Sequence, residues 1–377
     1  MNPSGTIAVI GGGPAGAMCA AGLAEAGRRV VLFDEKLAWE KPCGGGLTDK
    51  ALRQYPFLRA LEFRHNRVTE CELTSPRGRT LLLQLDREVA IFSRLDLNAL
   101  LLERARAAGV EIRRQRVTPT DPALLGADAL VLAAGARNLL RPSAPRAQDA
   151  LQWMATAGYY LPLAGLPWPR QRMAIRFLPA LDGYIWSFPR ADHASVGICG
   201  PLGRPPTREL RSRLEAWLDG LGIAWRGARF YSHLLPCTAP GALRTACYEG
   251  RDPVPWAIIG DAAHLVDPIT GEGLYYALRS GELLAQAWSS PGPSYTARVQ
   301  RELIPELEAA AALARRFYGG RFLGDSILER MALFASRSRR FRQLLCDLFA
   351  GSQGYLDLRT RLYRQLAPTL WEMATHP

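Results

Sequence analysis

Lysine is almost absent from this chain of 377 residues. It occurs only at Lys36, Lys41 and Lys50, so 47 basic residues minus three lysines leaves 44 arginines. The formal net charge of +12 would suit nucleic acid or an anionic membrane. Because the arginines are spread along the chain rather than gathered in one block, we expect no nucleic-acid partner. Contact with a membrane surface stays an alternative.

Paired cysteines and long hydrophobic runs are also missing. The seven cysteines are an odd number without a C-x-x-C pair, which argues against a disulfide framework, a metal site and an iron–sulfur cluster. An apolar run at 6–33 is divided by glycines and Pro14, so it fits neither a signal peptide nor a membrane span. We expect a cytoplasmic globular protein of two joined domains.

The first 35 residues have the pattern of strand, glycine turn, helix and strand. An apolar strand at 6–10 leads into Gly11-Gly12-Gly13-Pro14-Ala15-Gly16, a helix follows to about residue 26, and a strand at 30–33 ends in Asp34-Glu35. This order is a βαβ unit with the G-x-G-x-x-G motif in place. It predicts a Rossmann-like dinucleotide site.

Each small residue of this motif has an expected task. Gly11 permits the tight turn, Gly13 lets the backbone approach a pyrophosphate, and Gly16 allows close packing of helix and strand. Pro14 falls at the first helical position, where its missing N–H costs nothing. Asp34 is placed to hold the ribose hydroxyls.

A second glycine-rich region lies far along the chain, at 256–281. It begins as a short strand, turns at Gly260-Asp261 and passes through Pro268 to Gly271-Glu272-Gly273-Leu274, which opens a long helix. An uncapped helix start offers backbone N–H groups and a positive dipole end, which suit the electron-rich side of a flavin. The carboxylate of Asp261 is suited to a polyol hydroxyl. The alternative is a strand–loop–helix that serves stability alone.

Between these regions, a loop at 41–48 holds Cys43-Gly44-Gly45-Gly46. Three glycines would let a flat group approach the backbone, although a flexible turn has the same composition. Alternation at 67–92 predicts a β-hairpin inserted into the nucleotide-binding domain. A helix at 93–108 follows, and a buried strand at 127–136 ends in small residues that include Ala134 and Gly135.

The periodicity changes in the middle of the chain. Segments at 173–177, 184–188 and 194–198 alternate like strands of an antiparallel sheet, and an amphipathic helix spans about 207–221. We therefore predict a discontinuous nucleotide-binding domain at 1–145 and 246–290, a substrate domain at 146–245 and a helical region at 291–377. The arginine-rich C-terminal helices predict a solvated face, with an anionic membrane as the alternative.

With these motifs, the chain resembles the geranylgeranyl reductase family, part of the flavoprotein group that includes p-hydroxybenzoate hydroxylase. Gly11 to Gly16 with Asp34, the arginine of Ser93-Arg94-x-x-Leu97, and Gly260-Asp261 are similar to FAD-binding motifs of the whole group. The implied fold is α/β, a glutathione-reductase-type FAD domain with an antiparallel substrate sheet and a helical C-terminus.

Three other stretches are similar to the reductases in particular. They are Lys41-Pro42-Cys43-Gly44-Gly45-Gly46-Leu47, the strand Tyr184-Ile185-Trp186-Ser187-Phe188-Pro189, and the D-P-x-x-G-E-G-x-Y-Y-A run from Asp267 to Ala277. The resemblance implies a substrate cavity lined by Tyr184, Trp186 and Phe188. It implies an FAD site composed of Gly11, Gly13, Pro14, Ala15, Gly16, Asp34, Glu35, Cys43, Gly44, Gly45, Arg94, Ala134, Gly135, Gly260, Asp261, Pro268, Gly271, Glu272, Gly273 and Leu274.

The implied activity is saturation of carbon–carbon double bonds in a polyprenyl, geranylgeranyl-type substrate by hydride from reduced FAD. The proton source would be Cys43, with Tyr184 or water as alternatives, and the electron donor NAD(P)H or ferredoxin. The main rival is an FAD-dependent aromatic or polyketide monooxygenase. A flavin-dependent halogenase would need a lysine in the first domain near its tunnel, and the absence of lysine after Lys50 argues against it. A quinone-linked dehydrogenase would need cysteine ligands for a cluster, which the scattered cysteines do not provide. A non-enzymatic FAD-binding protein stays an alternative.

Overall fold

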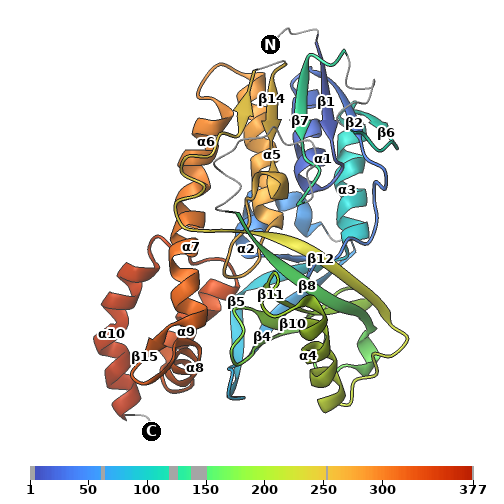
Figure 1. The fold of residues 1–377 in the computed structure, drawn as a ribbon. Coiled ribbons are helices and arrows are strands. Elements are labelled where there is room, and N and C mark those ends of the chain that lie inside the picture. Colours follow the sequence, from blue (N-terminus) through green and yellow to red (C-terminus); the bar gives the residue numbers. More distant parts are fainter. Residues whose placement is uncertain (1–4, 61–63, 119–125, 137–150, 252–253, 376–377) are drawn as a thin grey trace. The chain divides into compact units, whose positions relative to one another are not determined.

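The computed structural model describes residues 5–60, 64–118, 126–136, 151–251 and 254–375 (Figure 1). The chain divides into two compact units, each assembled from three segments. The first unit comprises residues 1–41, 94–152 and 234–308, and the second comprises 42–93, 153–233 and 309–377. The predicted domain boundary at 145 and 146 lies outside the described residues.

A six-stranded sheet forms the centre of the first unit. Its order is β13 (Glu249–Gly250), β14 (Trp256–Ile258), β7 (Ala129–Leu132), β1 (Thr6–Ile10), β2 (Arg29–Phe33) and β6 (Glu111–Arg113). All neighbours are parallel except β13 and β14. The four central strands β14, β7, β1 and β2 are short, mostly apolar runs because both of their faces are buried. The predicted return of the strand near 256 to the first sheet is confirmed.

Helices α1 (Pro14–Glu25), α3 (Arg94–Ala107), α5 (Leu274–Ser289) and α6 (Tyr295–Glu302) belong to the same unit. α1 and α5 lie side by side (Figure 1). Their contact is made of small residues: a β-carbon at Gly281 would stand 2.4 Å from the carbonyl oxygen of Ala15, and one at Gly22 would stand 2.9 Å from the β-carbon of Ala285. The small-residue composition of α1 therefore serves this close approach.

An eight-stranded sheet forms the centre of the second unit. Its order is β12 (Arg229–Thr238), β8 (Leu151–Pro162), β11 (His193–Pro201), β10 (Tyr184–Pro189), β9 (Arg172–Phe177), β4 (His65–Thr74), β5 (Thr80–Phe92) and β3 (Gly46–Leu47). β4 and β9 pair in parallel, whereas the pairs β10 with β9, β10 with β11, β11 with β8, β4 with β5 and β3 with β5 are antiparallel. This sheet contains the predicted strands of the middle region.

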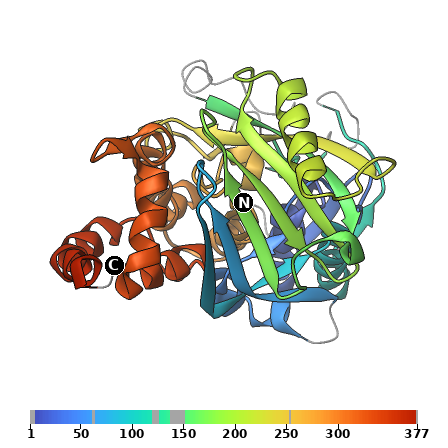
Figure 2. The same cartoon turned by 90° about the horizontal axis from the view of Figure 1, so that it is seen from below.

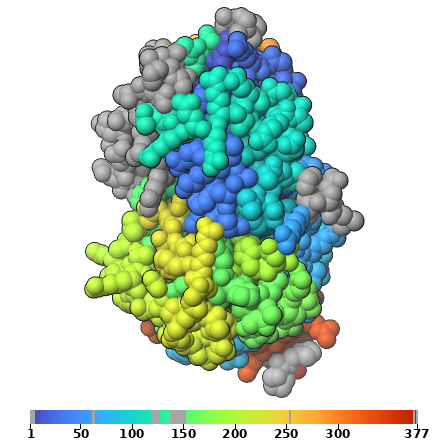
Figure 3. Space-filling view, turned by 90° about the vertical axis from the view of Figure 1, so that its right-hand side faces the viewer, coloured from blue at the N-terminus to red at the C-terminus, as the bar shows by residue number. Residues whose placement is uncertain are grey.

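Helix α4 (Thr207–Gly220) packs on the strands β8, β10 and β11, as Figure 2 shows. Leu210, Leu214 and Leu218 recur every four residues and are fully buried in this contact. The amphipathic helix predicted near 207–221 is confirmed. Strand β12 lies at the edge of the sheet and forms part of the surface in Figure 3. The Arg211 guanidinium carbon lies 4.5 Å from the centre of the ring of Phe230, an exposed residue of β12.

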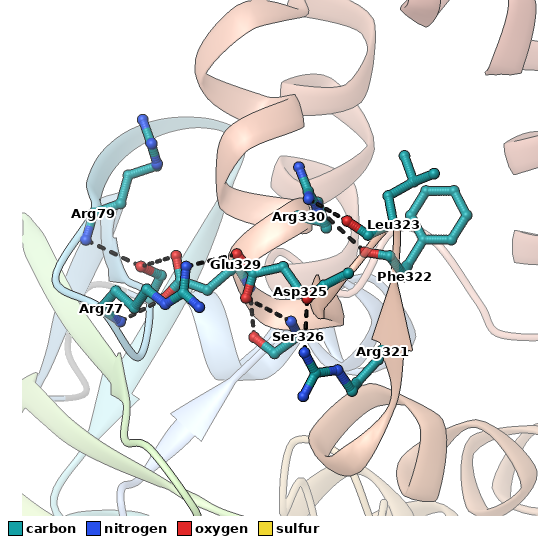
Figure 4. A network of polar contacts seen from close by, with 11 residues as sticks. Arg77, Arg79, Arg321, Phe322, Leu323, Asp325, Ser326, Glu329 and Arg330 are labelled. Carbon is teal, nitrogen blue, oxygen red and sulfur yellow. Dashed lines mark hydrogen bonds and ion pairs between the residues drawn. The ribbon is translucent and has the colours of Figure 1, made fainter.

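The C-terminal helices pack on the other end of this sheet. α8 (Ile327–Arg337) and α9 (Arg339–Phe349) bury apolar side chains against β4, β5 and β9. Figure 4 shows how the β4–β5 turn is held: the carboxylate of Glu329 accepts from Ser75 Oγ at 3.0 Å and from the backbone N–H of Arg77, whose side chain pairs with Asp325 at 2.8 Å.

Two features differ from the predicted organisation. The hairpin predicted at 67–92 exists, but its strands β4 and β5 belong to the second unit because β4 pairs with β9. The residues after 308 likewise belong to that unit, since α8 and α9 complete its core. They also contain a small hairpin, β15 (Arg321–Phe322) and β16 (Asp325–Ser326), that the sequence did not suggest.

Six further elements lie among the described residues. They are α2 (Asp49–Gln54), η1 (Pro56–Arg59), η3 (Leu163–Gly165), η4 (Gly260–Ala263) and α10 (Leu358–Thr375), together with α7 (Ile304–Gly319), which begins in the first unit and ends in the second. Among the residues that the structure describes, none of the helices combines the length and the apolar character that a membrane crossing requires.

Candidate active site

The first glycine turn is fixed by backbone atoms. Gly11 has a φ of +110°, and a β-carbon there would stand 2.3 Å from the carbonyl oxygen of Ala133 at the end of β7. A β-carbon at Gly16 would stand 1.9 Å from the carbonyl oxygen of Gly11. Both positions therefore require glycine for packing within the unit, whatever ligand binds there.

Gly13 differs from its neighbours in this turn. A β-carbon there would meet no described atom within 4 Å. Gly13 is the N-cap of α1, no described side chain caps this helix, and its first turn carries no acidic residue; Pro14 starts the helix. An open glycine at an uncapped helix start is an arrangement that accommodates an anionic group such as a pyrophosphate.

The carboxylate of Asp34 lies against this turn. Its Oδ2 accepts from the backbone N–H of Gly12 at 2.7 Å, and its Oδ1 accepts from the N–H groups of Lys36 and Leu37 at 2.8 and 2.7 Å. The neighbouring Glu35 is exposed and lies 3.9 Å from Arg116. Of the two predicted acids, Asp34 is the one held beside the glycines.

The second glycine turn packs directly on the first. Gly260 has a φ of +62°, and a β-carbon there would stand 2.9 Å from the β-carbon of Ala15 in α1. The backbone N–H of Gly260 donates to Ser280 Oγ of α5 at 3.0 Å. Two motifs separated by about 240 residues of sequence are thus brought together within one unit.

Asp261 stands at the start of α5. Its Oδ2 lies 3.5 Å from Lys41 Nζ, and its Oδ1 would be 3.3 Å from a β-carbon at Gly273, the N-cap of α5. Lys41 Nζ also lies 3.5 Å from the position of a β-carbon at Gly135. A partly exposed ion pair therefore borders the glycines that lead into this helix.

The loop before α5 is shaped by a buried carboxylate. Asp267 accepts from the backbone N–H groups of Ile269 and Thr270 at 2.7 and 3.1 Å, and Pro268 lies between Asp267 and Ile269. Gly271 has a φ of +71°, and the N–H of Glu272 donates to Thr270 Oγ1 at 3.2 Å. As at α1, no described side chain caps α5 at Gly273, and its first turn, which begins at Leu274, contains no acidic residue.

Arg94 and Ala134 also belong to the first unit. The Arg94 side chain is 4% exposed and donates to Asn98 Oδ1 at 3.2 Å, while its backbone N–H donates to Glu40 at 3.0 Å. Ala134 is exposed and its Cα lies 3.1 Å from the position of a β-carbon at Gly11. Arg94 is thus enclosed by its own unit, whereas Ala134 lies open beside the first glycine turn.

In the second unit, the cysteine–glycine loop is packed against an aromatic ring. Gly45 has a φ of +86°, and a β-carbon there would stand 2.0 Å from the carbonyl oxygen of Phe92. A β-carbon at Gly44 would stand 2.6 Å from the ring of Phe188. The backbone N–H of Gly45 donates to Cys43 Sγ at 3.3 Å, so the thiol is held next to its own loop.

Two side chains hold the carbonyl oxygen of Cys43. Arg190 Nη2 donates to it at 2.6 Å and Ser195 Oγ at 3.0 Å. Arg190 is 0% exposed, and Ser195 Oγ also lies 2.7 Å from Tyr231 OH and accepts from Trp186 Nε1 at 3.3 Å. Burial raises the pKa of Tyr231 above its usual range, so this hydroxyl stays protonated.

The three predicted aromatic residues share one face of β10. The ring centres of Tyr184 and Trp186 are 6.1 Å apart, and Tyr184 and Phe188 both pack against the cluster under α8 and α9. A β-carbon at Gly197 would stand 2.4 Å from the Trp186 ring. The strand therefore carries an aromatic row whose Phe188 end lies on the Cys43 loop.

Sequence reasoning did not identify several of these residues. They are Lys41 as the partner of Asp261, Ser280 behind the second glycine turn, and Arg190, Ser195 and Tyr231 around Cys43. Two of them had a signal in the sequence that could have indicated them: Lys41 is one of only three lysines, and Arg190 directly follows an apolar strand. Ser195, Ser280 and Tyr231 carry no distinguishing pattern.

Comparisons with known proteins agree with this geometry. Residues 5–155 match the family described as pyridine nucleotide-disulphide oxidoreductase. The menaquinone reductase of Mycobacterium tuberculosis (strain H37Rv) is 29% identical over 90% of this chain and 86% of its own. The geranylgeranyl diphosphate reductase of Synechocystis sp. is 26% identical over 96% of this chain and 93% of its own.

Solved structures share the fold over almost the full length. A geranylgeranyl bacteriochlorophyll reductase-like protein from Thermoplasma acidophilum superposes with a TM-score of 0.71 at 18% identity and covers 96% of this chain and 99% of its own. A flavin-dependent brominase has a TM-score of 0.69 at 16% identity, with 97% and 100% covered.

The chain is a flavin-dependent oxidoreductase with the α/β fold of the p-hydroxybenzoate hydroxylase group. The two glycine turns, each leading to a helix start without a side-chain cap, agree with this class. Within this class, the chain is similar to geranylgeranyl diphosphate reductases and shares its fold with a geranylgeranyl bacteriochlorophyll reductase-like protein.

Proposed function

We propose that this protein saturates carbon–carbon double bonds of a polyprenyl substrate by hydride transfer from reduced FAD. The observation that carries the proposal is the contact of Phe188 with Gly44, because it joins the aromatic row of β10 to the loop that bears Cys43. The names of the relatives agree with it, since geranylgeranyl diphosphate and a menaquinone both contain a chain of isoprene units.

The proposed flavin is FAD rather than FMN. The βαβ unit with open Gly13 and the carboxylate of Asp34 beside Gly12 provides the two features that an adenosine diphosphate half requires, a pyrophosphate site and a ribose acceptor. Asp261 and the start of α5 would serve the ribityl chain and the pyrimidine edge. Chromatography of the cofactor released by heat tests this point: FMN alone would overturn it.

Bound and reduced, the flavin supplies the hydride; the chain must supply a proton and a dry, ordered site. An isolated alkene accepts hydride poorly, so a proton must reach its second carbon as the hydride arrives. We assign the proton to Cys43 Sγ, which the N–H of Gly45 holds in place, with the Tyr184 hydroxyl or bound water as the alternatives. The row formed by Tyr184, Trp186 and Phe188 would line the apolar cavity.

Affinity for such a substrate would come from its chain. Burial contributes about 0.8 kcal/mol per methylene group, so a few isoprene units are sufficient for tight binding without a charged anchor. We therefore propose that selectivity follows chain length and position of the double bonds more than the polar head.

Anaerobic turnover tests the function. The purified flavoprotein is reduced by light, mixed with geranylgeranyl compounds without oxygen, and followed by flavin absorbance and product mass. Reoxidation with a gain of two hydrogen atoms supports the reductase. Reoxidation only after oxygen is admitted, with a gain of one oxygen atom, would establish the monooxygenase instead.

The electron donor is a separate question within the same proposal. The Gly11–Gly16 turn is the one nucleotide-binding motif that the sequence displays, and we assign it to FAD. Reduction of the bound flavin by NADH, NADPH and reduced ferredoxin, compared under the same anaerobic conditions, identifies the donor. A flavin that none of the three reduces would show that the electrons come from another carrier.

A further inference from the structure

The last helix, α10, carries an apolar face that nothing in the described structure covers. Leu362, Leu366 and Leu370 follow one another at intervals of four residues, so they lie on one side of the helix, and all three are exposed. Tyr363 and Trp371 border this row and are 65% and 72% exposed. These five residues are called the α10 face below.

The opposite side of α10 is firmly attached to its unit. Arg361 forms an ion pair with Asp347 of α9 at 2.5 Å, and Glu372 accepts from Ser338 Oγ at 2.6 Å and pairs with Arg340 at 3.1 Å. Thr369 is buried on this side. The helix is therefore packed in place, and its exposed leucines are not the result of a detached segment.

Positive charge surrounds the α10 face. Residues 309–377 contain eleven arginines against five carboxylates. Arg359 and Arg364 of α10 are exposed, and the Arg359 guanidinium lies 5.5 Å from the centre of the Tyr363 ring. At the other end of the helix, the bond between Glu372 and Arg340 brings the exposed start of α9 close to Trp371.

We propose that the α10 face docks on an anionic lipid membrane, with α10 lying flat at the bilayer surface. Leucines flanked by tyrosine, tryptophan and arginine are the composition of helices that bind in the interfacial layer, where aromatic rings and arginine stems suit the headgroup boundary. The positive charge around the α10 face is complementary to a negatively charged bilayer. A second copy of this chain would bring the same arginines face to face.

This inference does not depend on the proposed function. Membrane docking of α10 requires neither a bound flavin nor a particular substrate, so its failure would leave the enzyme assignment untouched. If both hold, the protein would take an isoprenoid substrate from the lipid phase.

Vesicle flotation of the full-length flavoprotein tests the proposal. The protein is floated with vesicles of phosphatidylcholine alone and of phosphatidylcholine with phosphatidylglycerol. We expect binding to the anionic vesicles, at least about tenfold weaker binding to the neutral ones, and release by high salt, because screening shortens the range of charge attraction. Absence of binding to the anionic vesicles would overturn the proposal.

Two variants locate the contact. The first is a triple variant that combines Leu366→Ser, Leu370→Ser and Trp371→Ser. It should weaken binding to anionic vesicles about tenfold or more, because the variant lacks most of the apolar area of the α10 face. The matched control replaces Leu82, Leu202 and Leu221 by serine; these leucines are 42%, 47% and 44% exposed and lie outside the C-terminal helices. The control should bind like the wild type, and an equal loss in both would refute a specific face.

A third variant separates charge from apolar contact. Arg359→Gln with Arg364→Gln should lower binding to anionic vesicles several-fold and leave binding to neutral vesicles unchanged. Sedimentation of the same proteins examines the competing occupant. A wild-type dimer that the α10 triple variant converts to a monomer, without vesicle binding by either, would identify the α10 face as a subunit interface and overturn the membrane proposal.

Discussion

Two glycine-rich loops, one in each unit, differ in the atoms that constrain them. The turn at 11–16 is constrained by backbone atoms, because β-carbons at Gly11 and Gly16 would meet carbonyl oxygens at 2.3 and 1.9 Å. The loop at 43–46 has a backbone constraint at Gly45, but its first residues are held by side chains from elsewhere: Arg190 and Ser195 bind the carbonyl of Cys43 across 147 and 152 residues of sequence, and the Phe188 ring covers Gly44.

This difference determines how each loop tolerates change. A carbonyl oxygen within a sheet cannot move aside for a new methyl group, whereas a side chain can adopt another rotamer at moderate cost. The first loop should therefore lose its fold when Gly11 or Gly16 is substituted. The second loop should keep its fold and lose the precise position of Cys43 when Arg190 or Ser195 is substituted.

The largest effect is expected for Gly16→Ala. The added β-carbon would overlap the carbonyl oxygen of Gly11, so we expect destabilisation of at least about 3 kcal/mol and no recoverable flavoprotein. Yield, thermal unfolding and bound flavin absorbance measure it. Gly220→Ala is the matched control, since a β-carbon at the end of α4 meets no described atom within 4 Å, and it should behave like the wild type. A folded, yellow Gly16→Ala protein would contradict the backbone constraint.

The next effect concerns Cys43 itself. Cys43→Ala removes only the thiol, so the protein should remain folded and yellow while anaerobic saturation slows about 100-fold or more, as expected for a lost proton donor. Single-turnover flavin reoxidation measures it.

Cys247→Ala removes an exposed thiol of the first unit and should leave this rate unchanged. Cys43→Ala turnover equal to the wild type would remove Cys43 from the mechanism and leave Tyr184 or bound water as the proton source. Tyr184→Phe is then the variant to compare.

Arg190→Met should separate position from chemistry. The variant deletes the buried donor to the Cys43 carbonyl and should cost about 2 kcal/mol of unfolding free energy. Released from this bond, Cys43 should react faster with iodoacetamide, which peptide mass mapping measures, while the flavin stays bound. Arg190→Lys should restore part of the slow reaction. An unchanged alkylation rate in Arg190→Met would show that Arg190 does not position the loop.

The contrast between the two loops also explains what could be predicted from the sequence. The βαβ unit, the strand at 256–258 that joins it and the helix α4 were predictable because local periodicity and glycine spacing specify them. The backbone turn at Gly11–Gly16 needs no distant residue, so its pattern was sufficient to predict its form.

The surroundings of Cys43 were not predictable in this way. Ser195 and Tyr231 reach the loop through strand pairings in an eight-stranded sheet, and no local pattern specifies which strands are neighbours. The same reason explains the hairpin at 67–92: alternation predicted its two strands, but only the parallel pairing of β4 with β9 assigns it to the second unit.

The smallest effect on folding is expected at Gly13, the one open glycine of the first turn that begins a helix. Gly13→Ala adds a methyl group where no described atom lies within 4 Å, so the unfolding free energy of the apoprotein should change by less than about 0.5 kcal/mol. If the pyrophosphate of FAD approaches this backbone, the methyl group should weaken FAD binding about tenfold, or ~1.4 kcal/mol. Titration of the apoprotein with FAD measures the affinity, and Gly165→Ala, an open glycine in the second unit, provides the control. Equal FAD affinity in Gly13→Ala and wild type would place the nucleotide elsewhere and separate this turn from flavin binding.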